Sequence, residues 1–276
     1  MKIQYLGTSA AEGFPAVFCN CEFCRAARRD LAREQRSRSQ MLIDGQLLVD
    51  FPPDAYLHAV RFGVDLSAVR ALLVTHSHTD HFYAQEFVNR GYKFASGMAV
   101  PDLDIYGNEE VAAVYAEGVR REMRGEVGEH IRFHVVHAFE KRRVGPYEVL
   151  SFPASHTPKE EALLYCIRGD KTVLYCNDTG LPAEECYRFL AENGVHADLV
   201  SMDCTQVDRG GSGRHMGLEQ NAALRDKLLE YGISDGKTKY YVTHFSHNSA
   251  PLRDRIDKLA AGYGFCAAYD GLVVEL

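Results

Sequence analysis

The chain has 276 residues, a net charge of −7 and a sequence pI near 5.9. An acidic protein has no general attraction for nucleic acid or anionic lipid, and no run of about 18 apolar residues is present to cross a membrane. With 46% hydrophobic residues and no Pro-, Gly- or Ser-rich linker, the sequence predicts one domain spanning residues 1–276.

The first residues, MKIQYLGTSAAEGFP, turn polar after one short apolar stretch, too early for the apolar middle of a secretory signal. We therefore expect a cytoplasmic protein. The eight cysteines do not predict a disulfide framework, because three of them fall within six residues and a reducing cytoplasm disfavours disulfides. Close spacing of thiols suggests metal binding instead.

In chain order, strands and helices are interleaved. Strands are expected at 2–7, on both sides of Asp44 and Gly45, and at 70–76, 131–136, 147–154, 162–178, 197–203, 239–245 and 265–276. Helices are expected at 21–34, 54–63, 80–91, 109–123, 182–194, 217–232 and 250–264. Asp44 and Gly45 between two apolar runs predict a hairpin with a type I′ turn, and Asn108 is a suitable helix N-cap. The pattern favours an α/β (α+β) protein with two sheets packed face to face and helices outside.

The strand expected at 70–76 leads into the sequence HSHTDH. Residues two apart on a strand point the same way, so His76 and His78 can face one ion. Asp80 and His81 follow where the chain turns, and they can face a second ion. Imidazole suits zinc, iron or manganese, and a carboxylate shifts the preference toward harder ions. Such a pair of sites needs further ligands, and His156, Asp178 and His244 each stand at the end of an apolar strand.

An HxHxDH motif followed by His, Asp and His resembles the metallo-β-lactamase superfamily. The resemblance implies an αββα sandwich with two divalent ions, zinc or manganese or else iron. It further implies that one ion is held by His76, His78 and His156, that the second is held by Asp80, His81 and His244, and that Asp178 bridges them. Asp50 and Asp203, each ending a strand, are candidates to orient the ligand histidines from behind.

A second cluster, FCNCEFC, places Cys19, Cys21 and Cys24 close together. Three thiolates need a fourth ligand to close a tetrahedral zinc site, and His247 is the candidate because it follows His244 by three residues. A closed site of this kind leaves no position for substrate, so we expect a structural zinc. The other cysteines, Cys166, Cys176, Cys186, Cys204 and Cys266, lie in apolar runs and are expected to be buried.

The resemblance narrows with five segments: LGTSAAEGFPAVFCNCEFCRAARRD, HSHTDH, NDTGLP, RHMGL and THFSH. Together they are similar to the phosphoribosyl 1,2-cyclic phosphate phosphodiesterases of the carbon–phosphorus lyase pathway. The opening segment is also similar to the pyrroloquinoline quinone biosynthesis members of the superfamily, which, as the comparison implies, do not keep the full hydrolytic ligand set. The segment 95–143 is longer than the phosphodiesterase comparison implies, at a position where substrate-contacting loops occur.

These resemblances predict hydrolysis of a small cyclic phosphodiester by a hydroxide that the two ions share. Besides the ligand Asp80, the catalytic candidate is His215, which precedes a helix start and would bind phosphate or protonate the leaving oxygen. The alternatives are a thioesterase or lactonase of the same fold, and a non-hydrolytic accessory protein. Among partners we expect a small phosphodiester but neither a membrane nor nucleic acid, and a homodimer is compatible with the sequence.

Overall fold

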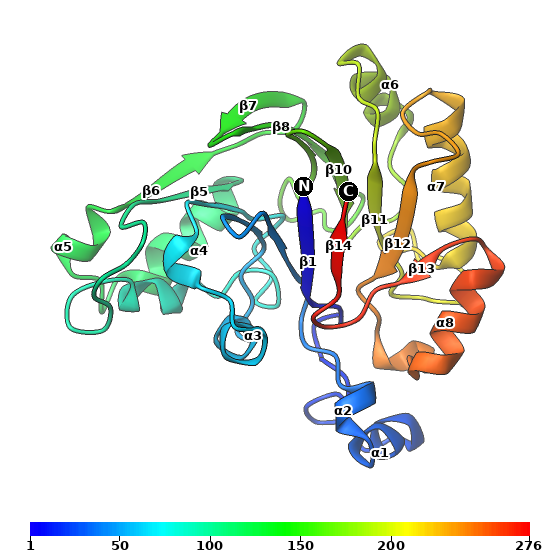
Figure 1. Cartoon of the computed structure of the whole chain (residues 1–276), viewed down its shortest axis with the longest axis horizontal. Coiled ribbons are helices and arrows are strands. Elements are labelled where there is room, and N and C mark those ends of the chain that lie inside the picture. The colour runs from blue at the N-terminus through cyan, green and yellow to red at the C-terminus, as the bar shows by residue number, and fades with distance from the viewer.

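The computed structural model describes residues 1–276 and contains two seven-stranded sheets packed face to face, with helices on their outer sides (Figure 1). This is the αββα arrangement, and the predicted fold class is confirmed. None of the helices combines the length and the apolar composition needed to span a bilayer.

The first sheet mixes antiparallel strands with a parallel block from β3 to β6. In spatial order it consists of β14 (Val273–Glu275), β1 (Lys2–Gly7), β2 (Gln40–Ile43), β3 (Leu47–Val49), β4 (Ala71–Leu73), β5 (Leu103–Gly107) and β6 (Ile131–Val135). Its outer side packs against α3 (Ala55–Phe62), α4 (Glu109–Val119), α5 (Gly125–Gly128) and the 3-10 helices η1 (Leu66–Ala68) and η2 (Ala84–Asn89).

The second sheet is parallel from β10 to β13 and antiparallel elsewhere. It consists of β13 (Cys266–Ala267), β12 (Lys239–Thr243), β11 (Leu199–Asp203), β10 (Thr172–Cys176), β9 (Leu163–Arg168), β8 (Tyr147–Pro153) and β7 (Glu140–Val144). Its outer side packs against α6 (Glu184–Glu192), α7 (Leu218–Glu230) and α8 (Arg253–Gly262). The short helices α1 (Glu22–Arg28) and α2 (Leu31–Glu34) project from the sandwich, and η3 (His247–Ser249) follows β12 (Figure 1).

The core divides according to the two faces of each strand. On β11, Leu199 belongs to the cluster between the sheets, whereas Val200 and Met202 belong to the cluster under the outer helices. Because both faces of the central strands are buried, these strands appear in the sequence as continuous apolar runs. The strands in the parallel blocks then present their carboxyl ends at one edge, which is where ligands bind in sheets of this kind.

Two local predictions are confirmed. Across the β2–β3 hairpin, the Gln46 N–H donates to the Ile43 carbonyl at 3.1 Å, and φ is positive at Asp44 (48°) and Gly45 (71°), as a type I′ turn requires. The Asn108 side chain accepts a hydrogen bond from the Val111 N–H at the start of α4, as an N-cap does.

The prediction of a helix at 80–91 is wrong except for the short η2. The chain there is held by other bonds: the Phe51 N–H donates to the His81 carbonyl at 2.7 Å, and the Tyr83 N–H donates to the Phe51 carbonyl at 2.8 Å. Backbone groups that pair with a neighbouring strand end cannot also form helical hydrogen bonds. The HSHTDH loop (residues 76–81), called the metal loop below, is thereby held against the residues that follow β3.

Other differences come from tertiary pairing. The predicted helix 21–34 is two helices, and β5 and β7 were not predicted. The closing stretch, expected as one strand, contributes β13 to the second sheet and β14 to the first, crossing between them at Gly271, where φ is 89°. Cys266 is the first residue of the edge strand β13 and is exposed, so its predicted burial is wrong. The long segment 95–143 forms β5, α4, α5 and β6 of the first layer and most of β7 of the second sheet, so it is part of the sandwich rather than one free loop.

Candidate metal centre

The candidate ligands stand on loops that leave both sheets at one edge. The HSHTDH loop follows β4 of the first sheet, and the other three residues follow strands of the second sheet: His156 after β8, Asp178 after β10 and His244 after β12. Asp178 and His244 both have a φ of 61°, in the left-handed region that residues with a Cβ seldom adopt. Such backbone conformations concentrate at functional sites, where the surrounding structure maintains them.

The first group of donors is His76, His78, His156 and Asp178, which offer one ligand atom each within 4.8 Å of one another. His78 Nδ1 lies 2.9 Å from His76 Nε2 and 3.2 Å from His156 Nε2. Burial lowers the pKa of His156 to about 4, which favours the neutral imidazole that binds metal.

The second group is Asp80, His81, Asp178 and His244, all of them buried. His81 Nε2 lies 3.3 Å from His244 Nε2 and 3.3 Å from an Asp80 oxygen. Burial alone would raise the pKa of Asp80, but the adjacent His81 more than offsets this and holds it below its usual range. The carboxylate form is the one that binds a cation.

Asp178 belongs to both groups through a single atom. Its Oδ2 lies 3.4 Å from His76 Nε2, 3.3 Å from His156 Nε2 and 3.3 Å from His81 Nε2. A tetrahedral ion with ligands at about 2.0–2.2 Å separates its ligand atoms by about 3.3–3.6 Å. These separations therefore fit two ions, one on each side of Asp178 Oδ2.

The Nδ1 atoms of His81 and His244, which face away from the two donor groups, also have polar partners. His81 Nδ1 lies 2.7 Å from Asp50 Oδ2, and Asp50 Oδ1 accepts hydrogen bonds from both the N–H and the hydroxyl of Thr75 at 2.9 Å. His244 Nδ1 lies 2.8 Å from the Thr205 hydroxyl. A buried carboxylate behind a ligand histidine fixes the orientation of the ring and raises its basicity. Asp50 thus occupies the supporting position predicted for it.

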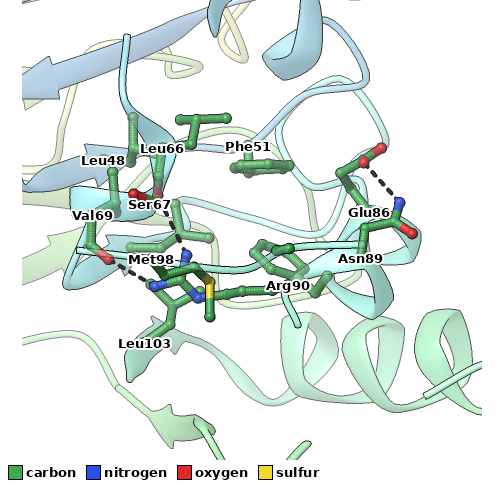
Figure 2. Close-up of a pocket in the computed structure, with 13 residues that line it drawn as sticks. Leu48, Phe51, Leu66, Ser67, Val69, Glu86, Asn89, Arg90, Met98 and Leu103 are labelled. Carbon is green, nitrogen blue, oxygen red and sulfur yellow. Dashed lines mark hydrogen bonds between the residues drawn. The ribbon is translucent and has the colours of Figure 1, made fainter. Parts of the chain in front are cut away.

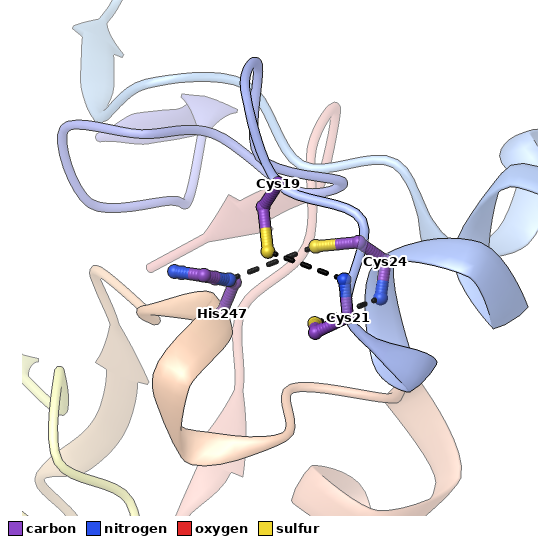
Figure 3. A group of neighbouring side chains, drawn as sticks. All are labelled: Cys19, Cys21, Cys24 and His247. Atoms are coloured by element: carbon purple, nitrogen blue, oxygen red, sulfur yellow. Dashed lines mark hydrogen bonds between the residues drawn. The ribbon is translucent and has the colours of Figure 1, made fainter.

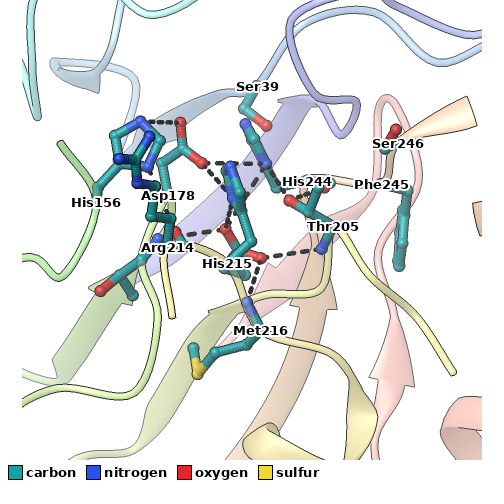
Figure 4. Close-up of polar contacts among 12 residues, drawn as sticks. Ser39, His156, Asp178, Thr205, Arg214, His215, Met216, His244, Phe245 and Ser246 are labelled. Atoms are coloured by element: carbon teal, nitrogen blue, oxygen red, sulfur yellow. Dashed lines mark hydrogen bonds and ion pairs between the residues drawn. The ribbon is translucent and has the colours of Figure 1, made fainter. Parts of the chain in front are cut away.

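Asp203, predicted for the same kind of role, lies instead next to His215. Figure 4 shows His215 beside Asp178. Asp203 Oδ2 is 3.0 Å from His215 Nδ1, whereas His244 Nδ1 is 3.8 Å away. His215 Nδ1 is also 2.9 Å from Asp178 Oδ1. Burial alone would lower the pKa of His215, but the two carboxylates raise it to about 10. The imidazolium form is therefore favoured, and the carboxylates outweigh any effect of the helix that follows.

Cys19, Cys21, Cys24 and His247 also come together, from the N-terminal loop, α1 and η3 (Figure 3). Cys24 Sγ lies 3.6 Å from His247 Nδ1. A tetrahedral zinc with sulfur at about 2.3 Å and nitrogen at about 2.0–2.1 Å requires a separation of about 3.5–3.6 Å. The Cys24 N–H donates to Cys21 Sγ and lowers the pKa of that thiol to about 6, whereas burial raises the pKa of Cys24 to about 11. The four donors fit a closed zinc site.

Sequence reasoning did not identify two groups that contact residues of the candidate two-ion centre. The Glu160 carboxylate accepts from the Ser77 N–H at 3.0 Å and from the Ser77 hydroxyl at 2.7 Å, so it holds the residue between His76 and His78. His156 Nδ1 lies 3.3 Å from the backbone carbonyl of Arg214. Neither contact carries a spacing signal, because the partners are joined only by the packing of distant loops.

A family model described as "Beta-lactamase superfamily domain" matches residues 47–245, which include all seven candidate ligands of the two-ion centre. The chain belongs to the metallo-β-lactamase superfamily. The model covers more than two thirds of the sequence, and the predicted family is confirmed.

Within the superfamily, the Coenzyme PQQ synthesis protein B of Methylobacterium radiotolerans is 30% identical over 132 residues, which is 43% of this chain and 44% of that protein. The match thus spans less than half of this curated relative. A solved structure described as a new diphosphatase from the PhnP family covers 100% of this chain and 97% of the other, with a TM-score of 0.76 and 21% identity. Zn²⁺-bound PqqB from Methylobacterium extorquens covers 100% of both chains, with a TM-score of 0.71 and 16% identity. At these identities the two structures establish a shared fold.

Proposed function

We propose that this protein is a metal-dependent phosphodiesterase that hydrolyses a small cyclic phosphodiester, such as a phosphoribosyl cyclic phosphate. The observation that carries the proposal is the position of Asp178 Oδ2, which lies 3.3–3.4 Å from donors of both groups. A carboxylate in this position would bridge the two ions of the proposed centre, and this supports the proposal. The resemblance to a PhnP-family diphosphatase supports chemistry at phosphorus.

In this proposal His76, His78 and His156 hold one ion, and Asp80, His81 and His244 hold the other, with Asp178 between them. Zinc or manganese, or else iron, would occupy the centre, and a structural zinc would occupy the cysteine cluster. A pair of such ions lowers the pKa of a shared water and stabilises the charge that develops on the phosphoryl oxygens. Asp80 would contribute to catalysis as a ligand.

His215 has the proton-donor role. Asp203 is outside the proposed ligand set, so its full negative charge remains available to hold the proton on His215 Nδ1. No hydrogen bond within the protein uses His215 Nε2, and this nitrogen is free to donate to the substrate. It would first donate a hydrogen bond to a phosphate oxygen and then give its proton to the leaving alkoxide.

The experiment is turnover of bis(p-nitrophenyl) phosphate, a thioester and a lactone by protein reconstituted with zinc, manganese or iron. We expect hydrolysis of the diester, loss of that activity with a chelator, and recovery when metal returns. On a diester with an alkoxide leaving group, such as a phosphoribosyl cyclic phosphate, the His215→Gln variant should keep its metal content but lose about 10²- to 10⁴-fold in kcat, the usual contribution of a general acid. Its loss on bis(p-nitrophenyl) phosphate should be smaller, because p-nitrophenolate leaves without a proton.

The controls separate the alternatives. If only the thioester or the lactone reacts, the protein is a carbonyl hydrolase and the proposal is wrong. If fully loaded protein hydrolyses neither these three substrates nor a phosphoribosyl cyclic phosphate, the alternative of a non-hydrolytic accessory protein becomes the better account, and the similarity to a coenzyme PQQ synthesis protein would then point to a biosynthetic role.

We further propose that the protein acts in the cytoplasm.

A further inference from the structure

The loop that leads into His215 carries an arginine beside the proposed two-ion centre. Arg214 directly precedes His215, and its backbone carbonyl lies 3.3 Å from His156 Nδ1. Figure 4 shows Arg214 close to His156. The loop also packs against the segment that follows Asp178, because a Cβ on Gly180 would collide with the Gly213 carbonyl oxygen. The backbone of Arg214 is therefore held next to the centre.

The side chain of Arg214 is exposed and has no partner within the protein. No carboxylate forms an ion pair with its guanidinium, and its only contact with the centre is made by its backbone carbonyl. Arg90 differs, because in the apolar cavity of Figure 2 its terminal nitrogens donate to the carbonyls of Leu66 and Val69. An exposed, unpaired guanidinium can form two parallel hydrogen bonds with a phosphate group.

A second unpaired cation lies on the neighbouring loop. Lys159 follows His156 by three residues and is exposed, and only its backbone N–H is bonded, to the Thr157 hydroxyl at 3.2 Å. The next residue, Glu160, is held by the Ser77 N–H at 3.0 Å. Lys159 thus stands between two residues that contact or form the centre, and its ammonium group is free to bind an anion.

The carboxylates of these two loops do not neutralise the two cations, because each carboxylate has another partner. Besides Glu160, they are Glu161, which accepts from the Ala138 N–H at 3.1 Å, and Asp208, which pairs with Arg255. The loops therefore add positive charge beside the centre, although the chain as a whole carries a net charge of −7. Positive charge at the mouth of a site attracts anionic ligands to it.

We propose that Arg214, together with Lys159, determines specificity by binding a phosphomonoester that the substrate carries in addition to its diester. This inference rests on the proposed phosphodiesterase function, in which the two ions and His215 take the diester phosphate. The two unpaired cations then remain for a second group. A phosphomonoester has a charge of about −1.5 to −2 at neutral pH, which matches two cations.

The test compares ribose 1,2-cyclic phosphate with the same compound bearing a 5-phosphate, as substrates of metal-loaded protein. Wild type should prefer the 5-phosphate compound about 10- to 100-fold in kcat/KM, the usual effect of a hydrogen bond to a charged group. Arg214→Gln should lose most of this preference through a higher KM for the 5-phosphate compound, with little change in its kcat, because the contact is remote from the reacting bond. Arg188→Gln, an exposed arginine on α6, is the matched control and should keep the preference.

Two further variants and a salt series sharpen the test. Arg214→Lys keeps the charge without the planar fork and should restore part of the preference, and Arg214→Gln combined with Lys159→Gln should remove the rest. Added salt should reduce the wild-type preference, because exposed charges are screened. Both substrates are measured on the same protein, so a general loss of metal or of folding does not imitate a lost preference.

The outcomes separate this inference from the function on which it rests. If wild type hydrolyses both compounds without preferring the 5-phosphate compound, or if the double variant keeps the wild-type preference, the role of Arg214 and Lys159 is overturned and the phosphodiesterase function stands. If fully loaded wild type hydrolyses neither compound, the phosphodiesterase proposal fails for this substrate class and the specificity role fails with it.

Discussion

Carboxylates outside the ligand set hold the metal loop in place from behind. Both oxygens of Asp50 are used, one by His81 and the other by Thr75, and the Tyr175 hydroxyl also donates to Asp50 at 3.3 Å. The φ of Asp50 is 64°, so its backbone too is turned out of the strand conformation to aim the side chain. One residue thereby orients a proposed ligand histidine and fixes the start of the loop.

The Asp50→Asn variant should therefore lose metal affinity or activity by about 10- to 100-fold, the effect typical of removing a partner behind a metal ligand. An amide has one acceptor oxygen and cannot serve both His81 and Thr75. Equilibrium dialysis with zinc and diester turnover measure the two effects. Asp226→Asn, an exposed position on α7, is the control, and equal affinities in the two variants would contradict the role assigned to Asp50.

Glu160 supports the first proposed ion site, that of His76, His78 and His156, in a similar way. Besides Ser77, its carboxylate accepts from the Asn108 amide at 2.9 Å, so it joins the metal loop to the start of α4. Glu160→Gln removes one acceptor oxygen and should weaken the binding of the ion at His76, His78 and His156 about tenfold, while the other ion stays bound. Metal counting by mass spectrometry reports the loss, and Glu161→Gln is the matched neighbour. Loss of both ions together would argue against this local role.

At the scale of elements, the N-terminal loop is bound to the end of β12. The Phe245 N–H donates to the Thr8 carbonyl at 3.0 Å, and a Glu12 oxygen accepts from the Ser246 hydroxyl at 2.6 Å and the His247 N–H at 3.0 Å. A zinc in the cysteine cluster would add a stronger link at the same place. This link lies three residues from His244 and would support that wall of the centre.

Cys19→Ser should then lower the zinc content by one ion and leave the two-ion centre loaded. The melting temperature should fall by roughly 2–4 °C for each kcal/mol that the zinc contributes. Metal analysis and calorimetry give the two values, and Cys266→Ser is the control because that thiol is exposed. An unchanged zinc content would show that the four donors do not form a zinc site.

At the scale of the whole molecule, the metal centre lies where the two sheets meet. The HSHTDH loop belongs to the first sheet, and His156, Asp178 and His244 belong to the second. Hydrogen bonds also join the sheets at this edge, among them the Tyr165 hydroxyl that donates to the Val74 carbonyl at 2.7 Å and the Leu163 N–H that donates to the Thr75 carbonyl at 2.8 Å. Ions at the centre would therefore cross-link the halves of the sandwich.

Free metal should accordingly stabilise the folded chain. At a concentration 100 times the dissociation constant, one site adds about 2.7 kcal/mol to the free energy of unfolding. Calorimetry at increasing zinc should show the melting temperature rising in wild type and rising less in Asp178→Ala, which keeps the cysteine cluster. Parallel curves for the two proteins would mean that the centre does not couple the sheets.

The sequence by itself determined the family, the αββα class and the grouping of local donors. HSHTDH and FCNCEFC are visible because their side chains are neighbours along the chain, and the strand ends are visible because apolar runs stop there. The same local patterns wrongly predicted a helix at 80–91, because the backbone at the start of this segment pairs with Phe51. Short-range sequence patterns indicate which reactive residue types lie close together along the chain, but they do not indicate which distant residues are in contact.

Only the tertiary structure decided how the distant residues meet. His81 and His244 are 163 positions apart, and their ring nitrogens come within 3.3 Å because β4 and β12 end at the same edge. The pairing of Asp203 with His215 and the contact of Glu160 with Ser77 were equally invisible in the sequence. Each depends on the packing of one sheet or loop against another, and that packing is a property of the whole chain.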